Sequence, residues 1–171
     1  MKMYLAHPFD TRHKLRQWEL EMEKKYPGFE LINPFYDVER DEVVGIDEGR
    51  LERYQFDPLT IVQRDIGLIE KVCNYNLLAY VTNAFSIGTI IEMTISRLNQ
   101  RNPRTLTLCV CDNGHHEHPW LRQFTTGIFK SHQEFEDTFL KTGLYLEMEH
   151  GKGRDNSVEP GKSKQTGVDA G

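Results

Sequence analysis

An apolar run that leads directly into a helix is the feature that most constrains this 171-residue chain. Residues 76–82 are mostly apolar between polar neighbours, which predicts a buried strand. Residues 87–100 then have the pattern of a helix, and Ser86 before them is a favourable N-cap. A helix start carries unpaired N–H groups and a partial positive charge, and Gly88 lets a ligand approach the backbone closely. We therefore expect the strand, the turn and the helix start to form the floor of a pocket.

Glu92 is the most unusual residue of this predicted helix. Its neighbours at helical spacing are small or apolar: Gly88, Thr89, Ile95 and Ser96. A carboxylate in such surroundings is either exposed by the turn of the helix or held in a dry pocket for a chemical purpose. The spacing alone does not distinguish these two interpretations.

Strands and helices alternate along most of the chain. Apolar runs predict strands at residues 2–6, 29–33, 76–82, 105–111 and 127–130, and helical patterns predict helices at residues 11–25, 57–72, 87–100 and 132–141. This alternation favours a three-layer α/β fold in which helices cover both faces of a mostly parallel five-stranded sheet. Ligands of such sheets bind beyond the carboxyl ends of the strands, near the point where the strand order switches.

The turns after the first and third predicted strands, residues 7–11 and 83–88, would be neighbours in this fold. Their adjacency would bring Tyr4, His7, Asp65 and Glu92 within reach of one cleft. Asp65 lies beside the apolar stripe of the helix predicted at residues 57–72, where a charged residue is out of place. A purely structural interpretation stays open, in which Asp65 and Glu92 are surface charges and Tyr4 is a core aromatic residue.

Two segments interrupt the alternation. Residues 35–56 form a long connection rich in Asp and Glu, which is either a functional lid or a solvated loop. Near its C-terminus the chain becomes polar, so we expect one domain at residues 1–147 and a disordered tail at residues 148–171.

Composition excludes several classes of partner. A net charge of −5 argues against a nucleic-acid polymer or an anionic membrane surface. No apolar run approaches the roughly 20 residues that cross a bilayer, and the initial apolar stretch is too short for a secretion signal. The three cysteines have no metal-type spacing, so we expect buried thiols and a cytoplasmic location. The histidines of residues 114–119 are adjacent in one loop, an arrangement that seldom converges on a metal ion.

A nucleophilic carboxylate at Glu92 would suit attack on the anomeric carbon of a sugar. The transition state of such a reaction resembles an oxocarbenium ion, which a nearby carboxylate stabilises. A second acid must then protonate or orient the departing group, and Asp65 is the natural candidate. Tyr4 would hold Glu92 in position through a hydrogen bond.

Three short motifs occur in a definite order: Tyr-Leu-Ala at residues 4–6, Arg-Asp-Ile at residues 64–66 and Ser-Ile-Gly-Thr-Ile-Ile-Glu at residues 86–92. Together they resemble the nucleoside 2-deoxyribosyltransferase family over roughly residues 2–141, and residues 128–131 resemble the last strand of that family. The resemblance implies a flavodoxin-like sheet, a homodimer or higher homo-oligomer whose subunits complete each other's sites, and no cofactor or metal. It also implies that Glu92 forms a covalent deoxyribosyl intermediate, that Tyr4 positions it, and that Asp65 is the acid that handles the base.

Ser86 departs from the common transferase pattern, which has an aspartate six residues before the glutamate. A serine there resembles the related 2'-deoxynucleoside 5'-phosphate N-hydrolases, in which it contacts the phosphate, and a helix N-terminus favours anions. The first turn lacks the glycine-rich, arginine-bearing loop of those hydrolases, although His7 and Arg12 would add positive charge there.

The favoured activity is therefore transfer of a deoxyribosyl group from a deoxynucleoside or deoxynucleotide to a free nucleobase. Hydrolysis of a deoxynucleoside 5'-monophosphate by water is the close alternative, and a non-catalytic nucleotide-binding module is the alternative from another class. We expect the substrate to contact Ser86, Gly88, His7 and Phe9.

Overall fold

The fold has a five-stranded parallel sheet at its centre, in a computed structural model that describes residues 1–36, 46–47, 50–51, 58–84, 86–100 and 102–150. The strand order is β2-β1-β5-β6-β7, and every neighbouring pair is parallel. The strands are β1 (Lys2–Ala6), β2 (Glu30–Ile32), β5 (Leu77–Val81), β6 (Thr107–Cys111) and β7 (Gly127–Phe129). This is the flavodoxin-like order, whose switch point lies between β1 and β5. The predicted α/β fold is confirmed, with a wholly parallel sheet.

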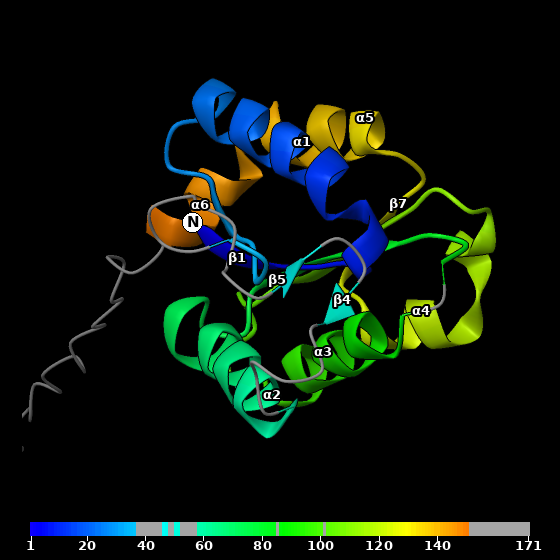
Figure 1. Cartoon of the computed structure of the whole chain (residues 1–171). Helices are drawn as coiled ribbons and strands as arrows, with labels where there is room; N and C mark the ends of the chain where they lie inside the picture. The colour runs from blue at the N-terminus through cyan, green and yellow to red at the C-terminus, as the bar shows by residue number, and fades with distance from the viewer. Residues whose placement is uncertain (37–45, 48–49, 52–57, 85, 101, 151–171) are drawn as a thin grey trace, which may run out of the picture.

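Helices cover both faces of the sheet and make the outer two layers (Figure 1). One face is covered by α1 (Arg12–Lys25) and α5 (His132–Phe135), and the other by α2 (Pro58–Gly67) and α3 (Ile87–Leu98). Two of these helices end in a π-helical turn, at Leu68–Val72 after α2 and at Glu136–Leu140 after α5. The predicted helices at residues 57–72 and 132–141 therefore correspond to a helix and the turn that continues it.

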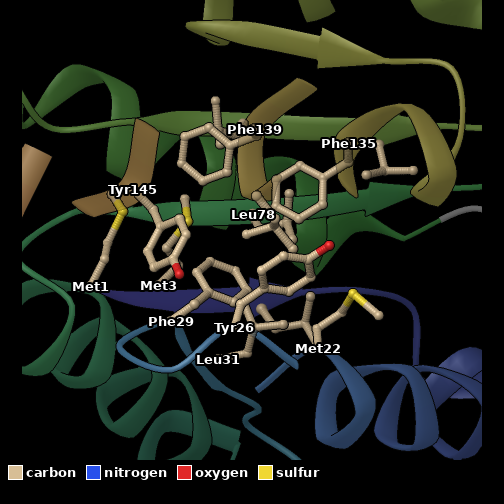
Figure 2. Close-up of a cluster of buried hydrophobic side chains, with 14 of the residues drawn as sticks. Met1, Met3, Met22, Tyr26, Phe29, Leu31, Leu78, Phe135, Phe139 and Tyr145 are labelled. Carbon is tan, nitrogen blue, oxygen red and sulfur yellow. The ribbon is translucent and has the colours of Figure 1, made fainter. Parts of the chain in front are cut away.

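Each face of the sheet has its own hydrophobic core, because successive side chains of a strand point to opposite faces. In β1, Met3 and Leu5 belong to the core beneath α1 and α5, whereas Tyr4 and Ala6 belong to the core beneath α2 and α3. Figure 2 shows the first of these cores, in which the fully buried ring of Phe135 lies among other aromatic rings and methionines. The alternation thus decides that Tyr4 points toward α2 and α3.

The structure also contains elements that the sequence patterns did not predict. These are α4 (Pro119–Phe124), α6 (Leu144–His150) and an antiparallel pair, β3 (Ile46–Asp47) and β4 (Arg50–Leu51), in the acidic connection. They are too short to show a clear hydrophobic period. Helix α6 packs Tyr145 into the core and continues past the domain boundary predicted at residue 147. The predicted tail beyond residue 150 and most of residues 35–56 lie outside the described residues.

Replacement of Phe135 tests the core beneath α1 and α5. Phe135→Ala should lower the free energy of unfolding by about 3–5 kcal/mol, because it removes a fully buried ring and leaves a cavity among its neighbours. Urea denaturation followed by circular dichroism measures this loss. The matched control is Leu20→Ala on α1, whose side chain is 44% exposed and whose loss should stay within about 0.5 kcal/mol. Equal losses in the two variants would contradict the assignment of this core.

Candidate active site

Two of the predicted catalytic side chains are joined by a hydrogen bond. The hydroxyl of Tyr4 donates to Oε1 of Glu92 over 2.7 Å, so the predicted contact is present. Tyr4 is fully buried in the middle of β1, where the strand holds it from both sides through pairing with β2 and β5. The hydrogen bond engages one carboxylate oxygen, and Oε2 has no hydrogen-bond partner among the residues that the structure describes.

The start of α3 places Glu92. Ser86 is the N-cap, as predicted, and its hydroxyl oxygen accepts a hydrogen bond from the backbone N–H of Thr89 over 3.3 Å. The buried face of the helix contains Thr89, Met93 and Ser96, which lie against the sheet. Each helical residue is rotated by about 100° from the last, so Glu92 lies at the edge of this buried face. There it points toward β1 and α2 and is only partly exposed.

Asp65 and its neighbour Arg64 come to the same place from α2. The guanidinium group of Arg64 donates to Oδ1 of Asp65 from Nε over 3.0 Å and from Nη2 over 2.8 Å. The charges of both residues act on Glu92 and on Tyr4. The structure therefore brings together the predicted set of Tyr4, Asp65 and Glu92. The structure adds Arg64 to this set. The sequence patterns assigned no role to Arg64, because its only distinguishing feature was its position next to Asp65.

Burial is the main cause of the unusual ionisation of this cluster. It raises the pKa of Glu92 from its ordinary value of 4.5 to about 7, where Asp65 raises it further and the Tyr4 hydrogen bond and Arg64 lower it. Burial also raises the pKa of Asp65, against the opposing effect of Arg64. The pKa of Tyr4 lies well above its ordinary value, first because of burial and then because of the charge of Glu92. Glu92 therefore exchanges a proton near neutral pH, as groups with catalytic roles often do.

His7 and Phe9, which the sequence predicts as substrate contacts, lie in the turn after β1 and contact other residues of the protein. His7 is buried, and its ring nitrogens lie 3.0 Å from the carbonyl oxygen of Pro8 and 3.2 Å from Oδ1 of Asn33. Burial lowers the pKa of His7 to about 4, so the expectation that its ring adds positive charge is wrong. The guanidinium carbon of Arg12 lies 3.8 Å from the centroid of the Phe9 ring, so these two side chains pack against each other.

A cavity of about 520 Å³ lies on the opposite flank of α3, toward α4. It is bounded by the end of β5 and by side chains that include Ser86, Ile90, Met93, Asn113 and Trp120. Ser86 is the one predicted substrate contact among its lining residues; Tyr4, Asp65 and Glu92 do not line it. Gly88 does not line it either, but a Cβ atom at Gly88 would meet no atom within 4 Å, so the backbone there faces open space. The cavity and the carboxylates thus lie on two sides of one helix.

Comparison with protein-family models, with curated proteins and with solved structures found no match for this chain. The family suggested by the three motifs therefore stays a prediction. Within the described residues, no three or more His, Cys, Asp or Glu side chains are grouped to hold a metal ion. None of the helices in the described part of the chain is long and apolar enough to cross a membrane.

The ionisation of Glu92 can be measured through stability, without any substrate. Because the pKa of Glu92 is raised by folding, its favourable contribution is complete below about pH 4.5 and is lost as the pH rises through about 7. At about 1.4 kcal/mol for each pKa unit, the ionised carboxylate costs roughly 3 kcal/mol at pH 8. We expect Glu92→Gln to unfold at a higher temperature than the unchanged protein at pH 8, and to lose this advantage at pH 5.

The readout is the difference in melting temperature between the two proteins at each pH, which cancels the titration of groups that do not interact with Glu92. Glu70→Gln, at an exposed position after α2, is the matched control and should show no such pH dependence. A difference for Glu92→Gln that stays constant from pH 5 to pH 8 would contradict the raised pKa.

Proposed function

We propose that this protein cleaves the N-glycosidic bond of 2'-deoxynucleosides and transfers the deoxyribosyl group to another nucleobase, as a member of the nucleoside 2-deoxyribosyltransferase family. The observation that carries the proposal is the cluster of Glu92, its hydrogen-bond donor Tyr4 at 2.7 Å and the second carboxylate Asp65. A nucleophilic carboxylate beside a second carboxyl group is what displacement at an anomeric carbon requires. The three motifs and the flavodoxin-like strand order support the same family.

The contacts within the cluster support one role for each carboxyl group in this reaction. Tyr4 holds Oε1 of Glu92, so Oε2 is the oxygen that attacks C1' of the sugar. The bond between C1' and the base nitrogen breaks, the bonding electrons leave with the base, and the carboxyl group of Asp65 donates a proton to the departing base. A nitrogen of the incoming base then attacks C1' and gives up its proton to Asp65. The bond between C1' and Oε2 breaks, which releases Glu92 as a carboxylate and completes the exchange.

Hydrolysis of a deoxynucleoside 5'-monophosphate is a second candidate, which the position of Ser86 favours. Ser86 stands at the N-terminus of α3 and lines the cavity, where the helix end attracts an anion. In this reaction water takes the place of the second base. A nucleotide-binding module without turnover is the third candidate, because the carboxylates do not line the cavity.

We also propose that the protein acts as a homodimer or a larger homo-oligomer in the cytoplasm. An exposed apolar stripe on α3 supports the association of several copies: Ile87, Ile91 and Leu98 are 60%, 51% and 70% exposed. Ile91 immediately precedes Glu92, so a second copy covering this stripe would lie close to the site. The cytoplasmic location is supported by three cysteines that are all buried and free.

Removal of the Glu92 carboxylate tests the proposed nucleophile. Glu92→Ala should abolish the formation of deoxyadenosine from deoxyuridine and adenine while circular dichroism shows an unchanged fold. The same proteins are incubated with deoxycytidine monophosphate in water, and free cytosine in place of deoxyadenosine would identify the hydrolase. Glu70→Ala, at an exposed glutamate, is the control and should keep full activity. Normal turnover by Glu92→Ala would contradict the assignment, and neither product from the unchanged protein would favour the binding module.

The role of Asp65 is tested by the rate at which the base leaves. Asp65→Asn keeps the size of the side chain but removes its proton exchange, so release of the first base should slow by about 100-fold or more. Binding of the deoxynucleoside should weaken far less. Rapid-quench measurement of base release in a single turnover separates the two effects. A variant that binds poorly but releases base at the normal rate would show that Asp65 only holds the substrate.

A further inference from the structure

We propose that Arg64 is a positioning residue of this site: it fixes one oxygen of Asp65, so that the other oxygen, Oδ2, faces the departing base. This inference rests on the proposed function, in which Asp65 handles the base. It gives a role to Arg64, the one residue of the cluster that has none in the proposed reaction.

The geometry of the contact is specific to one oxygen. Nε and Nη2 of Arg64 both donate to Oδ1 of Asp65, at 3.0 Å and 2.8 Å. Oδ2 has no hydrogen-bond partner among the residues that the structure describes. Two donors on one rigid guanidinium plane hold the carboxyl group against rotation, whereas the ammonium group of a lysine would act as a single point charge. The contact therefore orients Asp65 and leaves one oxygen available.

The spacing of the pair argues against an ordinary stabilising ion pair on the helix surface. Such pairs are three or four residues apart, because consecutive residues of a helix point about 100° away from each other. Arg64 and Asp65 are consecutive in α2, so the arginine side chain must bend back over its neighbour. Both side chains are partly buried, with 32% and 16% of their surfaces exposed, so solvent screens the contact only in part.

Arg64 also balances the charge of the whole cluster. The groups that act on Glu92 are Tyr4 from β1 and Asp65 and Arg64 from α2. Asp65 raises the pKa of Glu92, and Arg64 lowers it. Arg64 likewise lowers the pKa of Asp65 against the effect of burial. Without this cation, both carboxyl groups would hold their protons to a higher pH.

The test compares Arg64→Gln with Arg64→Lys, each made alone and together with Asp65→Asn. Arg64→Gln should slow base release by roughly 10- to 100-fold, because a hydrogen bond to a charged group is lost. Arg64→Lys keeps the charge but not the two-donor contact, so it should slow base release nearly as much. In the Asp65→Asn background, Arg64→Gln should slow release less than about twofold further, because an arginine that acts through Asp65 has nothing left to position.

A charge-sensitive measurement separates positioning from mere loss of structure. The pKa values of Glu92 and Asp65 are followed by carboxyl-carbon NMR during a pH titration. Both values should rise in Arg64→Gln and stay close to those of the unchanged protein in Arg64→Lys. Exposed Arg97→Gln on α3 is the control for loss of a positive charge and should alter neither value.

Two results would overturn the inference. One is a loss in the Asp65→Asn background as large as in the unchanged background, since Arg64 would then act independently of Asp65. The other is an unchanged pKa of both carboxyl groups in Arg64→Gln, which needs no turnover to be observed. If the unchanged protein exchanges no base but the pKa values rise in Arg64→Gln as described, the proposed function falls and the hold of Arg64 on Asp65 remains.

Discussion

The alternation of side chains along β1 is the constraint on which the rest of the structure depends. This strand lies at the switch point of the sheet, between β2 and β5, and is covered by helices on both sides. Met3 and Leu5 of this strand build the core beneath α1 and α5, and Tyr4 and Ala6 build the core beneath α2 and α3. A shift of one residue in its register would remove Tyr4 from Glu92 and expel Met3 and Leu5 from their core. The same pairing thus supports both stability and the candidate site.

Burial gives the carboxylates chemical properties that neither would have in water. Glu92, Asp65 and Tyr4 lie in one poorly solvated place, so each charge there raises the free energy of the others. The Tyr4 hydrogen bond and the guanidinium group of Arg64 offset part of this cost and keep the pKa of Glu92 at about 7. A carboxyl group that ionises near neutral pH changes its protonation state readily, as groups with catalytic roles often do.

Helix α3 separates two environments, the carboxylate cluster and the cavity. The carboxylate cluster lies on the flank toward β1 and α2, and the cavity of about 520 Å³ lies on the flank toward α4. At the N-terminus of the helix, Ser86 lines the cavity, and the backbone at Gly88 faces open space.

The sequence by itself determined the five strands of the sheet, the helices α1, α2, α3 and α5, and the set of Tyr4, Asp65 and Glu92. Hydrophobic period and capping residues are local signals, and parallel strands can be connected in few ways. The sequence could not show that His7 is buried and neutral, that Arg64 donates two hydrogen bonds to one oxygen of Asp65, or that α4 and α6 form. The state of His7 depends on distant side chains that contact its ring, Asn33 and Phe35 among them, and only the tertiary structure decides that. Spacing along a chain specifies which faces meet, whereas a pKa depends on everything that lies within a few ångströms once they have met.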